Sequence, residues 1–243
     1  MLILKKAHRY FYLGIVVLFF ILLFPLLFFY SRKVSRFKSL NHVRRFYSYI
    51  SSWVTGIFYR YTILIPVDWS RTYIICSNHT SNLDIPATTI AVKTNFAFIG
   101  KDELLRNPLL KIFFKTIDIA LNRESKISAF KAFKRGEEYL KQGISLVIFP
   151  EGKIGEEYPP ILHEFKNGPF RLAIEQQIPI LPISSKNIWK KMWDDGHIYG
   201  TRPGICDICI HPPVETKGLT LNDAEALKEK IYNIIHSELT NEH

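Results

Sequence analysis

From residue 72 onward, short apolar runs alternate with longer segments of helical character. The short runs predict strands near residues 72 to 77, 95 to 100, 117 to 121, 144 to 149, 179 to 184 and 204 to 210. The longer segments predict helices near residues 85 to 93, 102 to 115, 124 to 142, 168 to 177 and 221 to 239. This alternation is typical of βαβ units, so we expect an α/β fold with a mostly parallel sheet flanked by helices.

The amino-terminal part of the chain has a different pattern. Twenty residues from Phe11 to Tyr30 carry no charge, and a helix of that length matches a bilayer core of roughly 30 Å. The run is longer than the apolar part of a signal peptide, roughly 7 to 15 residues, and no small-x-small cleavage site follows it. We therefore expect a membrane helix. Pro25 leaves open whether this helix crosses the bilayer or lies in it.

Residues 46 to 65 are rich in aromatic side chains and are interrupted only by Arg60. This composition indicates an interfacial helix that leads into a strand, although an ordinary amphipathic core helix would look similar. We accordingly divide the chain into membrane-anchoring helices over residues 1–60 and an α/β domain over residues 61–243. With 243 residues, the chain is long enough for one sizeable core.

Basic residues exceed acidic ones, 32 against 22, which gives a formal net charge of +10. Six of them closely follow the apolar run, against three before it: Arg32, Lys33, Arg36, Lys38, Arg44 and Arg45, and Lys5, Lys6 and Arg9. The positive-inside rule then predicts that the α/β domain lies on the cytoplasmic side. The charge also favours an anionic membrane surface or an acidic partner, whereas no nucleic-acid-binding motif accompanies it.

The three cysteines are too few for a disulfide framework and favour a reducing compartment. Cys206 and Cys209 form a C-x-x-C pair, but residues three apart on a strand point to opposite faces. No H-E-x-x-H, dinucleotide fingerprint or P-loop occurs. We predict no metal and no cofactor.

Two polar segments follow predicted strands, where an open α/β sheet binds its ligands. The first reads NHTSNLD, from Asn78 to Asp84. On a regular helix His79 and Asp84 would lie about 140° apart, so they can meet only across a strand-to-helix turn. An aspartate bonded to one ring nitrogen leaves the other as a general base. The alternative is that Ser81 or Asp84 caps the following helix and that His79 only forms a hydrogen bond nearby.

NHTSNLD resembles the N-H-x-x-x-x-D signature of the glycerolipid acyltransferases, the family that contains 1-acyl-glycerol-3-phosphate acyltransferase. Further blocks of that family follow in order over about residues 60 to 210. They are Gly100-Lys-Asp-Glu-Leu-Leu-Arg-Asn-Pro108 with Ile117-Asp-Ile-Ala-Leu-Asn-Arg123, then Phe149-Pro-Glu-Gly152, Phe165-Lys-Asn-Gly168 and Ile178-Pro-Ile-Leu-Pro182.

The resemblance implies that His79, oriented by Asp84, removes the proton of a lysophospholipid hydroxyl, which attacks an acyl thioester directly. The thioester would be acyl-CoA or acyl carrier protein, as co-substrate. The absence of a G-x-S-x-G elbow agrees with this mechanism. Arg123 would bind the phosphate of the acceptor, because guanidinium matches phosphate geometry. The other residues expected around the acceptor are Asn78, Glu151, Gly152, Lys153, Lys166 and Gly168. For Glu151 a structural role in its turn is the alternative.

The chain departs from the family at one point. Gly152 is usually followed by Thr-Arg, and here Lys153-Ile154 follows. Lys153 would then replace a lost charge, or else the acceptor is a lyso-aminolipid of the ornithine or glycine type. A non-catalytic lipid-binding protein and a membrane-anchored hydrolase are the functions of other classes that stay open.

Overall fold

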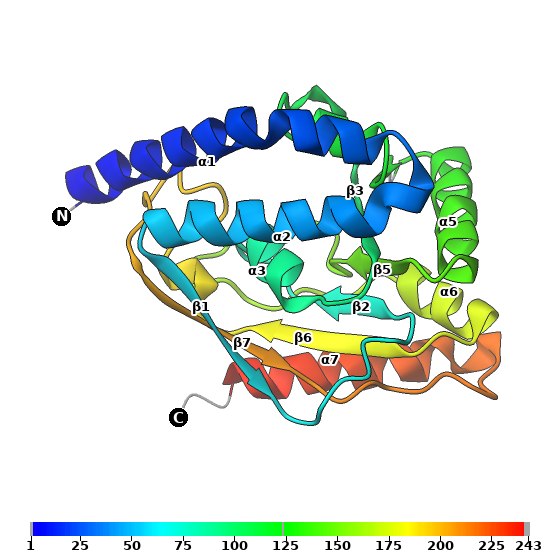
Figure 1. Cartoon of the computed structure of the whole chain (residues 1–243). Coiled ribbons are helices and arrows are strands. Elements are labelled where there is room, and N and C mark those ends of the chain that lie inside the picture. The colour runs from blue at the N-terminus through cyan, green and yellow to red at the C-terminus, as the bar shows by residue number, and fades with distance from the viewer. Residues whose placement is uncertain (1, 123, 241–243) are drawn as a thin grey trace.

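A seven-stranded sheet forms the centre of the molecule (Figure 1). The computed structural model describes residues 2–122 and 124–240. In spatial order the strands are β1 (Ile57–Ile63), β7 (Gly204–Ile210), β6 (Ile180–Ser185), β2 (Ile74–Ser77), β5 (Ser145–Ile148), β3 (Phe96–Lys101) and β4 (Ile119–Leu121). All neighbouring strands are parallel except β6 and β7, which are antiparallel. The expected mostly parallel α/β fold is confirmed.

The two faces of the sheet bury alternate residues of each strand. Ile74 and Leu146 belong to a core cluster with residues of α5 (Lys126–Lys141), α6 (Gly168–Gln176) and α7 (Ala224–Thr240). Ile75 and Val147 belong to a second cluster with Leu83 and with α3 (Asp84–Ala91). Because each strand is covered on both sides, the strands read as continuous apolar runs rather than as an alternating pattern.

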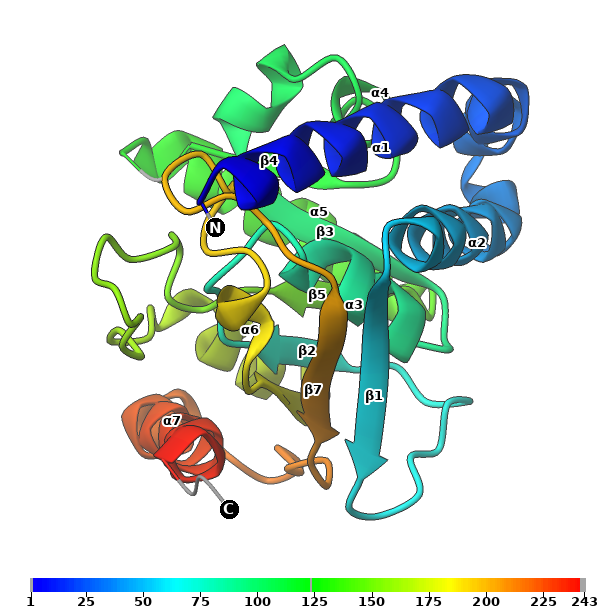
Figure 2. The same cartoon turned by 90° about the vertical axis from the view of Figure 1, so that its left-hand side faces the viewer.

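Two amino-terminal helices pack on the α3 side of the sheet, opposite α7 (Figures 1 and 2). They are α1 (Leu2–Ser31) and α2 (Phe37–Val54), joined by the 3₁₀ turn η1 (Val34–Arg36). Helix α1 is long and apolar enough to cross a membrane by length and composition. Many of its large apolar side chains, such as Ile21 and Leu22, are exposed.

Both ends of α1 contact the rest of the protein. Near its start, the carbonyl of Lys5 accepts a hydrogen bond from the amide of Thr201 at 3.0 Å, and Arg9 forms an ion pair with Asp195 at 3.1 Å. Near its end, Leu27 is fully buried in the first core cluster. The helix therefore lies along the α/β domain rather than leading away from it.

Helix α2 combines the two interpretations that the sequence left open. It begins at residue 37, and its Trp53 is exposed as in an interfacial helix, whereas Leu40 and Arg44 are buried as in a core helix. Strand β1 follows it and continues across position 60, where the sequence analysis divides the chain. Since β1 pairs with β7 along its whole length, the sheet takes part of its edge strand from the amino-terminal segment.

The helix predicted over residues 102 to 115 is wrong. The structure has a 3₁₀ helix, η2 (Asp102–Arg106), and a short helix, α4 (Lys111–Phe114). Pro108 disfavours a helical conformation at the preceding residue, and Asn107 is extended, with φ −74° and ψ 123°. The side-chain oxygen of Asn107 then accepts a hydrogen bond from the amide of Leu109. Short 3₁₀ helices η3 (Ile188–Lys190) and η4 (Leu221–Asp223) complete the fold.

Candidate active site

The polar segment that follows β2 lies at the carboxyl ends of three adjacent parallel strands. Asn78 connects β2 to β6, because its side chain donates to the carbonyl of Ser185 at 3.0 Å and accepts from the amide of Ser185 at 2.7 Å. Its side chain is fully buried, and it does not line the cavity described below. Asn78 therefore fixes the start of the turn that carries His79.

The turn brings His79 and Asp84 together. Nδ1 of His79 lies 3.0 Å from Oδ2 of Asp84, the first residue of α3. The same Oδ2 accepts hydrogen bonds from the amides of Thr80 at 2.7 Å and Ser81 at 2.9 Å. Asp84 is fully buried, whereas the side chain of His79 is 16% exposed. Since an ionised carboxylate only accepts, Nδ1 carries the ring proton and Nε2 has a free lone pair.

Two further contacts hold His79 in place, one through its ring and one through its backbone. Its ring stacks on Phe149, with centroids 4.1 Å apart and an interplanar angle of 16°. Phe149 directly follows β5, so a neighbouring strand supplies the platform. The backbone amide of His79 donates to Oε1 of Glu151 at 2.7 Å. The ring is thus held on one face and at one nitrogen, as a positioned base requires.

Glu151 lies beneath the turn rather than in the cavity. Its two carboxylate oxygens accept hydrogen bonds from the backbone amides of His79 and His163, the second at 2.9 Å. Burial raises the pKa of Glu151 to about 7, against the opposing effect of those two hydrogen bonds. This geometry matches the structural role that the sequence analysis kept as an alternative. A contribution of Glu151 to acceptor positioning stays a prediction.

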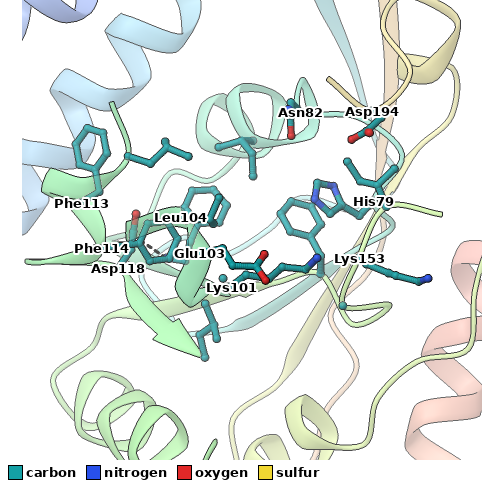
Figure 3. A pocket seen from close by; sticks show the side chains of 18 of the residues that line it. His79, Asn82, Lys101, Glu103, Leu104, Phe113, Phe114, Asp118, Lys153 and Asp194 are labelled. Carbon is teal, nitrogen blue, oxygen red and sulfur yellow. Dashed lines mark hydrogen bonds between the residues drawn. The ribbon is translucent and has the colours of Figure 1, made fainter. Parts of the chain in front are cut away.

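A cavity of about 790 Å³ opens beside His79 and extends beneath α2. Figure 3 shows His79, Lys153 and Asp194 at one end of it and Phe113, Phe114 and Asp118 at the other. Between the two ends the lining is mainly apolar, with Ile85, Phe98, Ile99, Leu104 and Leu110. The cavity therefore joins a polar mouth with a histidine to a long apolar interior.

A buried ion pair lines the far end of the cavity. Arg44 of α2 donates to both carboxylate oxygens of Asp118, at 3.2 and 3.0 Å. Asp118 also accepts a hydrogen bond from the amide of Phe98 at 2.9 Å. The guanidinium lies 4.9 Å from the ring centroid of Phe113. The pair is bidentate and stacked on an aromatic ring, which is the geometry that stabilises a buried arginine.

The other predicted site residues lie in different places. Gly152, with φ +86°, and Lys153 line the cavity. Lys166 is exposed and outside the cavity lining. Gly168 starts α6 against Phe133, where an added Cβ would come within 2.4 Å of the ring, so it serves close packing. Arg123 lies outside the described residues.

Several cavity residues were not predicted from the sequence, namely Lys101, Trp193 and Asp194. Lys101 ends β3, a position that the rule of ligand binding at strand ends would have selected. Asp194 comes from a loop more than a hundred residues after His79. No local sequence pattern connects the two.

One group of side chains among the described residues could in principle bind a metal. Cys206 packs in the second core cluster, whereas Cys209, with His211 and Glu238, belongs to a group whose possible ligand atoms lie within 4.8 Å of one another. Each of the three already has a protein partner. Nζ of Lys186 donates a hydrogen bond to Glu238 at 2.7 Å, and Cys209 forms a hydrogen bond with Glu238. The hydroxyl of Ser184 lies 2.8 Å from Nε2 of His211. We keep the prediction of no metal.

A family model and several known proteins match the chain. Residues 52–186 match the family model described as Acyltransferase. The chain is similar to 1-acyl-sn-glycerol-3-phosphate acyltransferase alpha of Mus musculus, with 30% identity over 70% of this chain and 59% of the mouse protein. It is also similar to 1-acyl-sn-glycerol-3-phosphate acyltransferase of Haemophilus influenzae, with 25% identity over 68% of each chain. The match thus spans about three fifths of the mouse relative's length.

The fold itself has a solved counterpart. The crystal structure of the 1-acyl-sn-glycerophosphate (LPA) acyltransferase PlsC from Thermotoga maritima superposes with a TM-score of 0.75. The superposition covers 98% of this chain and 94% of that one, at 22% sequence identity. The likeness therefore includes the amino-terminal helices as well as the sheet.

Proposed function

The chain belongs to the acyltransferase family, and from that premise we propose that it transfers a fatty acyl group from an acyl thioester to the free hydroxyl of a lysophospholipid. The first acceptor to test is 1-acyl-glycerol-3-phosphate, which the names of the relatives support. The observation that carries the proposal is the 3.0 Å contact between His79 and Asp84 at the mouth of an apolar cavity.

The reaction follows from the free Nε2 of His79. This nitrogen takes the proton of the acceptor hydroxyl while the oxygen attacks the thioester carbonyl carbon. Asp84 stabilises the imidazolium that forms. When the tetrahedral intermediate collapses, the carbon–sulfur bond breaks and the leaving thiolate takes the proton back from His79. No acyl-enzyme is needed, and the three cysteines are buried, which speaks against a thiol nucleophile.

The apolar cavity suits a fatty acyl chain. Burying methylene groups among Ile99, Leu104 and Phe114 gains about 0.8 kcal/mol for each CH₂. The carbonyl carbon of such a chain would then reach the mouth, where His79 lies. The thioester donor, acyl-CoA or acyl carrier protein, would remain outside the cavity with only its acyl group inserted.

The charges of the cavity lining favour a second candidate acceptor. Lys101 and Lys153 line the described part of the cavity together with Glu103, Glu156 and Asp194. Lys153-Ile154 also stands where the family usually has Thr-Arg. A purely anionic phosphate headgroup gains little from this balance, whereas a lyso-aminolipid would bring both charges. We therefore propose lyso-aminolipids as the alternative acceptors.

We further propose that α1 holds the protein on the membrane by lying in its surface. The exposed apolar residues of α1 support membrane attachment. Its contacts with the α/β domain near both ends, through Arg9 and Leu27, favour a lying over a crossing arrangement. The cationic residues Lys33 and Lys38, next to this helix, would meet anionic headgroups. We propose that the α/β domain lies on the cytoplasmic side, where the negative surface potential of the membrane would attract these cationic residues.

The function is tested with the full chain in lipid vesicles. A panel of lysolipids, including lysophosphatidate and a lyso-aminolipid, is offered with acyl-CoA or acyl carrier protein, and the products are identified by mass spectrometry. We expect a diacyl lipid from the wild type and a loss of at least about a thousandfold in His79→Ala. His236→Ala, which changes an exposed histidine of α7, serves as the matched control.

Other outcomes would contradict the proposal. Full activity of His79→Ala would exclude the general-base mechanism. Release of free fatty acid without an acceptor would indicate a hydrolase. Binding of lysolipid without any product, in the presence of both donors, would indicate a non-catalytic lipid-binding protein.

A further inference from the structure

The loop over residues 192–201 is attached to the turn that carries His79 and Asp84. The amide of Asp194 donates to the carbonyl of Thr80 at 3.0 Å, and the carbonyl of Asp194 accepts from the amide of Asn82 at 2.9 Å. Both partners lie between the two members of the His79–Asp84 pair. The backbone of Asp194 is therefore fixed relative to the proposed base.

Asp194 has an unusual backbone conformation for a residue with a side chain, with φ 50°. The same loop has two other positive φ values, at Gly196 (75°) and Gly200 (71°). Those glycines are pressed against α1, since an added Cβ would meet Arg9 and Lys5 respectively. Glycine avoids the strain of this conformation, and aspartate tolerates it better than most residues. At the position that faces the cavity, the chain keeps a carboxylate in spite of the strain.

The carboxylate of Asp194 lies at the mouth of the cavity, at the same end as His79 (Figure 3). The pKa of Asp194 is raised overall, because the effects of burial and of the neighbouring Asp195 outweigh the lowering by the charges of His79 and Lys101. Asp194 and His79 are therefore close enough to interact electrostatically.

The other charged groups around His79 have separate places. Asp84 holds its Nδ1, Glu151 accepts a hydrogen bond from its backbone amide, and Asp194 and Lys101 are at the mouth. Five more charged residues line the described part of the cavity, namely Arg44, Glu103, Asp118, Lys153 and Glu156.

We propose that Asp194 is a positioning residue of the acyl transfer, whose carboxylate stabilises the imidazolium of His79 while the ring holds the acceptor's proton. The inference rests on the proposed role of His79 as the general base. Asp84 supplies one negative charge on the buried side of the ring, and Asp194 adds a second one on the cavity side.

This role predicts a particular kinetic change. Without the carboxylate the imidazolium is less stable, so proton removal from the acceptor becomes harder and kcat falls. The KM for an anionic acceptor does not rise, because a negative charge has been taken away from the mouth. The titration midpoint of the His79 imidazole moves to lower pH, since a neighbouring negative charge favours the protonated ring.

The experiment uses Asp194→Asn in the full chain. Asparagine also tolerates a positive φ, so the backbone contacts with Thr80 and Asn82 are kept. We expect kcat to fall about tenfold at unchanged acceptor KM, and the His79 midpoint to fall by about half a unit to one unit, followed by NMR on the ring signals. The ring signals follow His79 directly, so the titration of Glu151, whose pKa is about 7, is not mistaken for that of the ring.

Asp195→Asn is the matched control. Asp195 is the adjacent aspartate. Its carboxylate forms an ion pair with Arg9 of α1, and Asp195 does not line the cavity. This variant removes the same charge from the same loop and tests whether loosening the loop is enough to lower activity. We expect at most a twofold change in kcat and no movement of the His79 midpoint. Asp194→Gly, which relieves the strain, should behave as Asp194→Asn does.

Three results would overturn the inference. The first is an unchanged His79 midpoint in Asp194→Asn. The second is a rise in acceptor KM at unchanged kcat, which would make Asp194 a binding residue. The third is an equal loss in both asparagine variants, which would show a loop effect. If the wild type transfers no acyl group, the proposed function fails, while the NMR titration still decides whether Asp194 acts on His79.

Discussion

The cavity has a buried aspartate at each end, and their surroundings differ. Asp118 at the far end is paired with Arg44 through both of its oxygens, at 3.2 and 3.0 Å. Asp84 near the mouth uses a single oxygen, Oδ2, for His79 and two backbone amides, while its Oδ1 has no hydrogen-bond partner among the described residues. Both oxygens of Asp118 therefore have hydrogen-bond partners, whereas one oxygen of Asp84 has none among the described residues.

This difference explains why only one of the two pairs is suited to chemistry. The guanidinium of Arg44 donates hydrogen bonds only and has no lone pair to offer a substrate. The imidazole of His79 can accept a proton, because its second ring nitrogen is free. The same residue type, aspartate, therefore stabilises the fold beside an arginine and orients a base beside a histidine.

The largest expected effect comes from Asp84→Asn. The amide keeps the shape of the carboxylate but carries no charge, so its oxygen holds Nδ1–H and the two backbone amides less strongly and does not stabilise the imidazolium. We expect kcat to fall by about a thousandfold or more, as is typical when the orienting carboxylate of a base is neutralised. The measurement is acyl transfer in vesicles. Asp118→Asn is the comparison, and we expect it to change stability more than kcat.

A nearly wild-type kcat in Asp84→Asn would contradict this view of the mouth. Equal losses of kcat in the two asparagine variants would remove the distinction between the two ends of the cavity.

The second prediction tests the far end through stability. Arg44→Met leaves Asp118 buried without its cation, and we expect a loss of about 3 to 5 kcal/mol in the free energy of unfolding. In the double variant Arg44→Met with Asp118→Asn, no unpaired charge remains and the amide of Phe98 keeps an acceptor. The double variant should be more stable than the single one, as measured by chemical denaturation. A less stable double variant would contradict the ion-pair account.

The sequence predicts the arrangement at the mouth better than at the far end. His79 and Asp84 are five residues apart, so one turn decides whether they meet, and a local argument is sufficient. Arg44 and Asp118 are 74 residues apart and meet only because α2 packs across the sheet. In the sequence Arg44 is one of six basic residues after the apolar run. Nothing local distinguishes a buried arginine from one that faces a membrane.

The fold follows the same division between local and distant information. Buried strands are continuous apolar runs, so six strands were predicted near their observed positions. The predicted helix over residues 102 to 115 was wrong, although Pro108 is a local signal for the break. The position of Asp194 depends on backbone hydrogen bonds to Thr80 and Asn82, on a segment far away in the chain. Such contacts are decided by the folded structure as a whole.

The third prediction concerns Glu151, the carboxylate under the mouth. Its pKa is raised from 4.5 to about 7 by burial. A carboxyl group with a raised pKa contributes stability that is fully present below its unfolded pKa and is lost as the pH rises through the folded value. Between about pH 4.5 and 7 the wild type should therefore lose up to about 3 kcal/mol from this group.

In Glu151→Gln this contribution is removed, since glutamine does not titrate. We expect a flatter dependence of the melting temperature on pH between 5 and 7 than in the wild type, measured by thermal unfolding. Glu229→Gln, at an exposed carboxylate of α7, is the control and should leave the wild-type slope. Parallel pH profiles for wild type and Glu151→Gln would show that Glu151 does not titrate as proposed.

The smallest expected effect arises between the two ends, at Gly100. An alanine Cβ there would come within 2.8 Å of the Phe114 ring and 3.0 Å of Leu104, both of which line the cavity. The flexible Leu104 and the ring must move by a few tenths of an ångström into the cavity. We expect Gly100→Ala to shift the preferred acyl chain by about one methylene toward shorter donors, since one methyl group fills roughly the space of one CH₂ at about 0.8 kcal/mol. Competition between donors of different length, with the products weighed by mass spectrometry, measures this shift.

Gly14→Ala on α1, where an added Cβ meets nothing within 4 Å, is the control. An unchanged preference in Gly100→Ala would mean that the acyl chain does not pass Gly100. The chain would then not fill the cavity as far as the buried pair of Arg44 and Asp118.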